Sequence, residues 1–344
     1  MVKKRYIVLG AVVLGLALVA LCLGGARRGV VGDDRRDFAA ETFRGASEMR
    51  YVQLSLYPKE EKHLTPDGMM AVKNALEASL TADGIAPSGS YLLVGSGETT
   101  VTLARESAMA DGMTSVNTTD ATATVYFGDW FGLHPTAPLT GGFVDAGDTG
   151  HGYCVIDEYA AARLFGSVDV CGLDITVNGQ MYTVTAVVSA ERGTYSGYYG
   201  YTPRVYLLYN SPAMLSARLT FTSLEAVLPS MTTGRARSIF LDAVKSYYDD
   251  ESEVVENTDR YTPLRLYEKV KTLTRMAVAE GDTYPYYENI SRIRETKCAM
   301  LLVFEAVCYI GAAVLLCILL WIWLHPLAKR HKERRAAKKL HAIV

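Results

Sequence analysis

Histidine, cysteine and acidic side chains lie close together near the middle of the chain, and their types suggest metal binding. His151 precedes Cys154 by three residues, and Asp145, Asp148 and Asp157 lie nearby. Zinc sites use such side chains at recurring ligand spacings. These residues instead fall on a predicted loop, a strand and a helix cap, without such a spacing. We therefore expect ordinary loop and capping roles, and the sequence predicts neither a metal ion nor another cofactor.

Motifs for nucleotide binding and for nucleophilic catalysis are absent from the sequence. There is no G-x-x-x-x-G-K-[ST] loop to bind phosphate groups. There is also no G-x-S-x-G nucleophile elbow, because Gly95-Ser96-Gly97 is too short and favours a turn. An envelope hydrolase would need a nucleophile beside a base, and no such pair is recognisable. We predict that the chain is not an enzyme and that any use of ATP depends on a partner.

The most unusual local composition is a glycine-rich segment that contains four tyrosines. Tyrosine offers a large amphipathic contact area and loses little side-chain entropy on binding. The segment is therefore predicted either to contact a partner or ligand, or to fold back on its own domain with its hydroxyl groups in water. The four residues are Tyr195, Tyr198, Tyr199 and Tyr201.

Two long apolar segments are predicted to cross a membrane as helices. Residues 6–25 contain no charge, and residues 298–324 contain only Glu305. About 20 apolar residues are enough to span the hydrocarbon core. The first segment could instead be a cleaved signal peptide, but no A-x-A site follows it. Glu305 is a further candidate partner contact, because an ionisable group in a span is a functional hypothesis. It is expected either to pair with the span of another subunit or to reach the interface.

Basic residues predict the orientation of both helices. Seven Lys and Arg residues follow the second span, within 325–344, whereas only Arg292, Arg294 and Lys297 closely precede it. By the positive-inside rule, both termini are expected to be cytoplasmic and residues 26–297 extracytoplasmic. The basic tail is expected either to bind anionic lipid headgroups or only to set the topology.

The segment between the two spans is acidic and contains few cysteines. Residues 26–297 contain 25 Lys and Arg against 35 Asp and Glu. Such a domain is a poor binder of nucleic acid, so we predict no nucleic-acid partner. Cys154 and Cys171 are the only cysteines in this segment. An oxidising compartment would allow them to form a disulfide, and two buried free thiols are the alternative.

This extracytoplasmic segment is predicted to mix helices and strands. Alternation at 51–56 indicates a half-buried strand, and Thr65-Pro66-Asp67 is typical of a capped helix start. Asp157 is predicted to cap a helix that ends at Gly166, and Asn178-Gly179 suits a type I′ turn between two strands. The other expected elements are strands within 91–128 and at 153–156, 173–177, 181–188, 204–209 and 218–224, helices at 234–248 and from 262, and one helix from Pro285 into the second span.

The order of these elements and several short patterns resemble the periplasmic core domain of MacB-type ABC transporter permeases. In that family a glycine-rich approach precedes an apolar strand, a helix that ends in Leu-Phe-Gly, and a hairpin that ends in Val-Val-Gly-Val. Here Cys171 replaces the usual Ile, and Ala186 replaces the usual Gly. The matching segments are Gly141–Phe143, Tyr153–Asp157, Ala161–Gly166, Val170–Gly172, Ile175–Gly179 and Tyr182–Val188.

The resemblance is specific over residues 121–209 and weaker over 5–230. It implies an α+β ectodomain with a two-lobed MacB-type periplasmic core, on stalk helices between two transmembrane helices. The expected segments are a cytoplasmic N-terminus (1–5), a first transmembrane helix (6–25), a stalk (26–50), the core domain (51–256), a closing helix and stalk (257–297), a second transmembrane helix (298–324) and a basic cytoplasmic tail (325–344).

The resemblance also implies a function. We expect a non-catalytic, membrane-anchored subunit of a MacB-like ABC transport system, whose core domain is coupled through stalk helices to a partner ATPase. Permeases of the family have two further spans, which this chain is expected to lack. Its partners are therefore an ABC ATPase and, where another subunit supplies those spans, a multi-span permease. The alternative is a stand-alone extracytoplasmic binding or sensing module with no ATPase partner.

Overall fold

The chain folds into two compact units. The structure, a computed structural model, describes residues 2–32, 38–108, 113–143, 152–190, 202–214, 219–249, 252–270 and 284–341. We call the two units the sheet unit and the helical unit. The sheet unit comprises Asp34–Arg260 and Ala279–Ser291, and the helical unit comprises Met1–Asp33, Tyr261–Val278 and Arg292–Val344.

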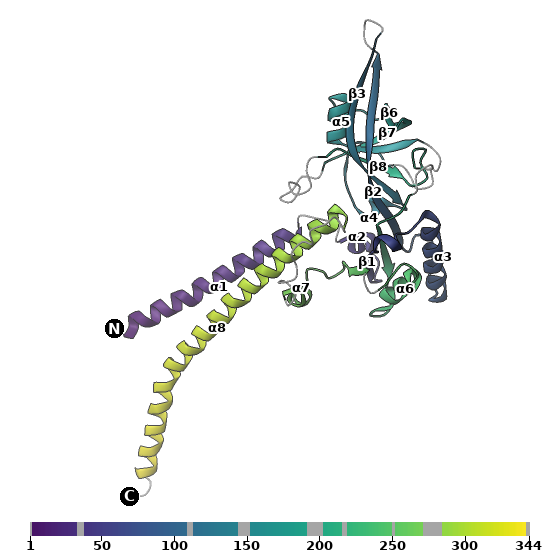
Figure 1. The fold of residues 1–344 in the computed structure, drawn as a ribbon. Helices are drawn as coiled ribbons and strands as arrows, with labels where there is room; N and C mark the ends of the chain where they lie inside the picture. The colour runs from purple at the N-terminus through teal and green to yellow at the C-terminus, as the bar shows by residue number, and fades with distance from the viewer. Residues whose placement is uncertain are drawn as a thin grey trace. The chain divides into compact units, whose positions relative to one another are not determined.

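The sheet unit contains one mixed sheet, which has ten strands in the described part of the chain (Figure 1). The strand order is β10-β1-β9-β2-β3-β8-β5-β7-β4, and β6 pairs with β2 and β7. Most neighbours are antiparallel, whereas β3–β8 and β5–β7 are parallel. The strands are β1 (Tyr51–Tyr57), β2 (Leu92–Ala108), β3 (Thr114–Phe127), β4 (Pro138–Gly141), β5 (Tyr153–Asp157), β6 (Asp174–Val177), β7 (Gln180–Val188), β8 (Arg204–Leu208), β9 (Ser223–Pro229) and β10 (Glu253–Glu256).

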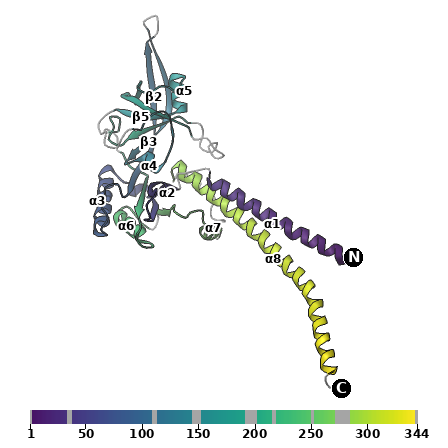
Figure 2. The same cartoon turned by 180° about the vertical axis from the view of Figure 1, so that it is seen from behind.

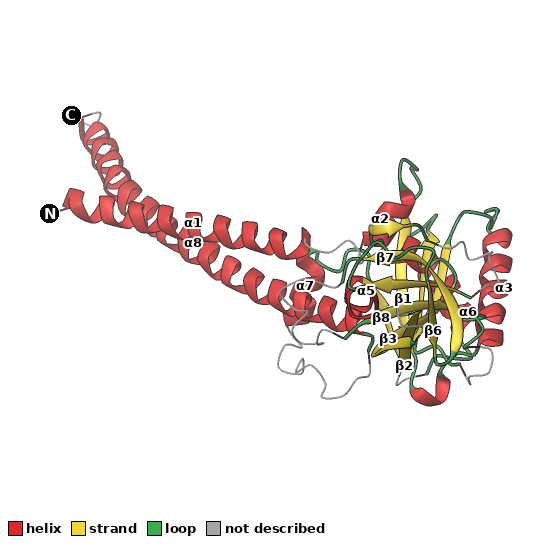
Figure 3. Ribbon diagram, turned by 90° about the horizontal axis from the view of Figure 1, so that it is seen from above, coloured by secondary structure: helices red, strands yellow, loops and turns green. Residues whose placement is uncertain are grey.

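Helices pack on the sheet at several places, and two of the buried clusters that they form are the lobes of the core. Near β1 and β9, α3 and α6 lie together and bury Leu54, Leu76 and Phe240 (Figure 3). Beside β3, β5 and β7, α5 buries Leu164 and Val184 in a second cluster. The predicted α+β core is therefore confirmed. The helical elements of this unit are α2 (Ala39–Arg44), a 3-10 turn η2 (Glu60–Lys62), α3 (Pro66–Ala82), α4 (Trp130–Leu133), α5 (Glu158–Phe165) and α6 (Arg235–Val244).

Local sequence signals place the ends of these elements as predicted. The side chain of Thr65 accepts a hydrogen bond from the backbone of Gly68 at the start of α3. Asp157 accepts from the backbone N–H of Ala160 at 2.7 Å, and α5 ends at Gly166 in the left-handed conformation. Asn178 and Gly179 both have positive φ, as a type I′ turn between β6 and β7 requires.

Two strand predictions were wrong for the same physical reason. The strand at 51–56 was expected to be half-buried, but Gln53 and Ser55 are as buried as their apolar neighbours. The strand expected at 218–224 begins only at Ser223 and continues to Pro229, and all its residues are buried. Strands that are covered on both faces do not follow the solvent-facing alternation by which a half-buried strand is recognised.

Other predicted boundaries lie close to the observed ones or outside the described residues. α6 occupies the central part of the helix expected at 234–248. The helix expected from 262 is observed from Pro263 to Val270, and the residues that follow, 271–283, are outside the described residues. Within the range predicted as a stalk, 26–50, α1 continues to Gly32, and α2 contributes two buried alanines to the core of the sheet unit.

In its described part, the helical unit contains the two long apolar helices and one short helix. These are α1 (Val2–Gly32), α7 (Pro263–Val270) and α8 (Tyr286–His341), whose first residues belong to the sheet unit. α1 and α8 lie side by side (Figure 2), with Leu16 near Gly311 and Gly24 near Glu305. Within the described residues, two segments are long and apolar enough to cross a membrane, Tyr6–Gly32 and Tyr286–Pro326.

The buried cap of α5 predicts a measurable pH dependence. Burial raises the pKa of Asp157 from its ordinary 3.8 to about 6, although the Ala160 N–H opposes this rise. Because the folded pKa is raised, the penalty for ionising Asp157 is absent below pH 3.8, grows with rising pH and is complete above pH 6. Asparagine also caps helices but does not ionise. We expect wild-type stability to fall by about 3 kcal/mol relative to Asp157→Asn across this range. Parallel curves of urea unfolding against pH would contradict this.

Candidate functional site

A buried face of β1 presents polar side chains toward the start of α8. Gln53, Ser55 and Tyr57 share this face, because alternate residues of a strand point the same way. On the neighbouring strand β9, Glu225 lies directly opposite Ser55. Both residues are buried, and Glu225 is only 2% exposed. A carboxylate buried to this degree must be hydrogen-bonded to be tolerated.

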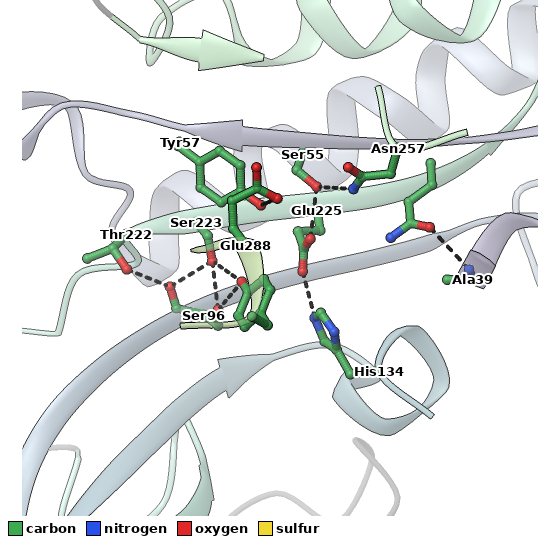
Figure 4. Close-up of polar contacts among 12 residues, drawn as sticks. Ala39, Ser55, Tyr57, Ser96, His134, Thr222, Ser223, Glu225, Asn257 and Glu288 are labelled. Carbon is green, nitrogen blue, oxygen red and sulfur yellow. Dashed lines mark hydrogen bonds and ion pairs between the residues drawn. The ribbon is translucent and has the colours of Figure 1, made fainter. Parts of the chain in front are cut away.

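A chain of hydrogen bonds links these strands to two loops (Figure 4). His134, at the end of α4, places Nε2 2.6 Å from one carboxylate oxygen of Glu225. Ser55 donates to the other oxygen at 2.8 Å. The side-chain amide of Asn257, which follows β10, donates to the Ser55 hydroxyl at 2.9 Å. Each oxygen of the Glu225 carboxylate therefore has a hydrogen-bond partner, Ser55 for one and His134 for the other.

The same chain continues to an ion pair on the first turn of α8. Arg260 donates to Asn257 at 3.1 Å and binds both carboxylate oxygens of Glu288 at 2.9 Å. Tyr57 donates to Glu288 at 3.3 Å. The side chains of Arg260 and Glu288 are 3% and 2% exposed. We call this set the helix-start network, and its members are Ser55, Tyr57, His134, Glu225, Asn257, Arg260 and Glu288.

Electrostatics keep Tyr57 in its donor form. Burial raises its pKa well above the ordinary value, and the nearby carboxylates of Glu288 and Glu225 raise it further. The phenol therefore stays protonated at neutral pH and can donate to Glu288. At His134, Nδ1 is buried without a partner in the described part of the chain.

Two aromatic residues add further contacts between the first turn of α8 and the sheet. The Tyr287 hydroxyl lies 3.0 Å from the hydroxyl of Ser223 and 3.3 Å from that of Ser96. The Tyr286 ring lies 3.8 Å below the guanidinium of Arg204, which also binds Glu98 at 2.7 Å. Tyr286, Tyr287 and Glu288 are all buried. The start of α8 is therefore fixed to β1, β2, β8 and β9.

These contacts join protein segments, and they define a structural attachment site for α8. Each carboxylate of the helix-start network already accepts bonds from at least two protein donors. Across the residues that the structure describes, no three His, Cys, Asp or Glu side chains group together as metal ligands would. Asp145, Asp148 and His151 lie outside those residues. Cys154 and Cys171 are both free thiols, and the Cys171 Sγ donates to Thr140 at 3.4 Å.

The predicted partner-contact residues are only partly described. Tyr195, Tyr198, Tyr199 and Tyr201 lie outside the described residues, so their role stays a prediction. Glu305 is described and lies in the helical unit, where its carboxylate is 3.3 Å from Arg27 Nε. Gly24 of α1 lies beside the same carboxylate. Because glycine has no side chain, the carboxylate of Glu305 can approach α1 closely at this position. Glu305 therefore has a partner within its own chain.

Reasoning from the sequence missed the helix-start network. Its members are ordinary residue types, drawn from β1, α4, β9, the segment after β10 and α8. One signal was available in the sequence, namely the alternation of Gln53, Ser55 and Tyr57 with three apolar residues. Which polar side chains meet depends on the pairing of β1 with β9, which follows from no local pattern.

Comparison with known proteins agrees with this architecture. The family model of the MacB-like periplasmic core domain matches residues 7–244. Because this match covers more than half of the sequence, the chain belongs to the MacB-like periplasmic core domain family.

Solved structures that match part of this chain include two transporter domains. The extracellular domain of the ABC-type transporter YknZ from Gram-positive bacteria is 16% identical, with a TM-score of 0.40 over 60% of this chain and 100% of that one. The periplasmic region of MacB from Actinobacillus actinomycetemcomitans is 12% identical, with a TM-score of 0.43 over 70% of this chain and 99% of that one. No curated protein matches the sequence.

The buried ion pair predicts a strongly non-additive mutational effect. Arg260→Met leaves the Glu288 charge buried without its counter-ion, so we expect a loss of about 3–5 kcal/mol of stability. Arg260→Met combined with Glu288→Leu removes both charges, so we expect it to cost less than Arg260→Met alone. Thermal unfolding of the full-length chain, followed by tryptophan fluorescence, measures both variants.

An exposed pair provides the matched control. Arg50 and Asp259 form an ion pair at 2.8 Å, but their side chains are 52% and 53% exposed. Arg50→Met is expected to cost less than about 1 kcal/mol, because water screens such pairs. Equal losses from Arg50→Met and Arg260→Met, or simple additivity in the double variant, would contradict the role given to Glu288.

The ion pair between Arg27 of α1 and Glu305 of α8 predicts that loss of one charge destabilises the packing of these two helices. Glu305→Gln leaves Arg27 without its counter-charge between two apolar helices, so we expect a lower melting temperature in detergent. Arg27→Met combined with Glu305→Met is expected to recover part of the loss. A fall in the recovery of a bound partner, with an unchanged melting temperature, would instead identify Glu305 as an intersubunit contact.

Proposed function

We propose that this protein is a non-catalytic, membrane-anchored subunit of a MacB-like ABC transport system. Membership of the MacB-like periplasmic core domain family supports the transporter context. The single observation on which the proposal depends is the helix-start network. The apolar helix α8 begins inside the sheet unit, where the buried ion pair of Arg260 and Glu288 holds its first turn. Such a helix is suited to pass movement to the unit in which it begins.

The proposed topology has two spans with both termini in the cytoplasm. α1 and α8 expose large apolar side chains along their spans, such as Leu14 (63%) and Val307 (61%). Near the end of the second span, Trp321 and Trp323 suit the interfacial region of a bilayer. Basic residues of the 325–344 tail follow directly. The positive-inside rule then supports a cytoplasmic tail and an extracytoplasmic sheet unit.

The proposed coupling uses α8 as one continuous element. The helix is unbroken from Tyr286 to His341, with Pro326 inside it. A partner ATPase in the cytoplasm would act near the basic end of α8. Displacement of the helix would then act on Glu288 and through Arg260 on the segment after β10. The tyrosines of the 195–201 segment are a proposed contact surface for a partner.

The proposal is tested by identifying what the protein binds in the membrane. The tagged full-length chain is purified in a mild detergent, and the co-purified proteins are identified by mass spectrometry. We expect an ABC ATPase to be recovered, either alone or together with a multi-span permease. The tagged chain with Arg50→Met is the matched control, because this exposed side chain pairs with Asp259 and is not a member of the helix-start network.

The same experiment can overturn the proposal. Recovery of the chain alone, or with extracytoplasmic proteins only, would contradict the transporter-subunit role and favour the stand-alone binding or sensing module. In the recovered complex, Arg260→Met is expected to reduce the stimulation of ATP hydrolysis by this subunit while the ATPase still co-purifies. Unchanged stimulation would show that the helix-start network does not couple the two proteins.

A further inference from the structure

α7 is an amphipathic helix in the helical unit, and only half of its apolar face is covered by protein. Leu266 is fully buried and Val270 partly buried, whereas Leu264 and Tyr267 are 70% and 57% exposed. With about 3.6 residues per turn, these four side chains form one continuous apolar face. The opposite face contains Arg265, Glu268 and Lys269. The residues that pack around Leu266 are Val30, Val31, Tyr261, Cys298, Ala299 and Leu302.

This packing places α7 at one end of the two apolar spans. Val30 and Val31 follow the uncharged part of α1, and Cys298 begins the apolar run of α8. Leu302, the deepest contact, lies four residues into that run, or about 6 Å along the helix axis. Helices that lie on a membrane surface bury their apolar face by about 5–10 Å. The depth of α7 along the spans therefore matches that of an interfacial helix.

The same end of the helical unit is strongly basic. Residues 26–32, 261–270 and 292–305 contain seven Lys and Arg against three Glu. Three of these basic residues, Arg28, Arg265 and Lys297, are exposed. A positive surface beside an apolar helix face is complementary to phosphate-containing lipid headgroups, which attract Lys and Arg by about 1 kcal/mol each.

We propose that α7 is a membrane-surface helix, which inserts Leu264 and Tyr267 into the extracytoplasmic leaflet while the surrounding basic residues bind anionic phospholipid headgroups. The inference rests on the two-span topology of the proposed function. It accounts for the division of the apolar face: Leu266 and Val270 contact α1 and α8, and Leu264 and Tyr267 contact lipid. Tyrosine also suits this depth, because its ring is apolar and its hydroxyl polar.

Depth-dependent quenching tests the proposal on the full-length chain. A genetically encoded fluorescent amino acid is placed at Leu264, Tyr267, Arg265 or Leu316, one position at a time. Each variant is reconstituted into phosphatidylcholine–phosphatidylglycerol vesicles with or without bromine on the acyl chains. We expect strong quenching by bromine at 264 and 267 and much weaker quenching at 265, the matched control on the polar face. Leu316, which is 48% exposed in the apolar span, reports whether the span is in the bilayer.

Any other result of the quenching experiment would contradict one specific part of the proposal. Quenching at 316 without quenching at 264 and 267 would overturn the membrane-surface helix and leave the topology standing. Iodide quenching at 264 would then show that the face is in water, and protection from both quenchers would show that protein covers it. Absence of quenching at 316 would contradict the two-span topology itself, and with it the proposed function.

A second comparison tests the headgroup charge. Replacing phosphatidylglycerol with phosphatidylcholine is expected to weaken bromine quenching at 264 in the otherwise wild-type chain. In the chain with Arg265→Gln and Lys297→Gln, quenching is expected to depend less on phosphatidylglycerol, because two exposed positive charges are removed. Equal dependence in both chains would overturn the anionic-headgroup part of the proposal.

Discussion

The buried ion pair between Arg260 and Glu288 is the interaction on which the organisation of the sheet unit depends. It joins the segment after β10 to the first turn of α8 through two hydrogen bonds of 2.9 Å. A buried pair contributes little net stability relative to apolar packing, but it penalises any arrangement that separates the charges. Its main effect is therefore to select one register for the start of α8, with Tyr57 and Asn257 as further ligands of the same pair.

The polar network around this pair is acceptable only because nearly every buried group has a partner. Glu225 would be costly between two strands if Ser55 and His134 did not bind its oxygens. The apolar side of the same strands packs against α3 and α6 and supplies ordinary hydrophobic stabilisation. One face of β1 thus stabilises the fold, and the other determines where the long helix begins.

The helical unit uses charge in a different setting. Glu305 and Arg27 join α8 to α1, and each side chain is about 15% exposed or less. In a span, a lone carboxylate is expensive, and pairing within the chain reduces that cost. Among the ion pairs of the described residues, these two have distinct tasks: one lies at the start of α8, and the other joins α1 to α8.

Much of the architecture could be predicted from the sequence, because it depends on local signals. The caps at Thr65 and Asp157, the turn at Asn178-Gly179 and both apolar helices follow from residues that lie within a few positions of each other. The two apolar segments follow from composition alone, because an uncharged run of about 20 residues has few other uses. The sequence by itself therefore determined the elements and the class of the domain.

Only the tertiary structure decided which polar residues meet. The helix-start network joins Ser55 to Glu225 and Asn257, and Arg260 to Glu288, across long sequence separations. These meetings depend on strand order and register, in which β1 lies between β9 and β10. A strand pattern records only whether a side chain faces core or solvent, and both faces of β1 are buried. No residue in the network therefore differs in type or spacing from an ordinary surface residue until the sheet is assembled.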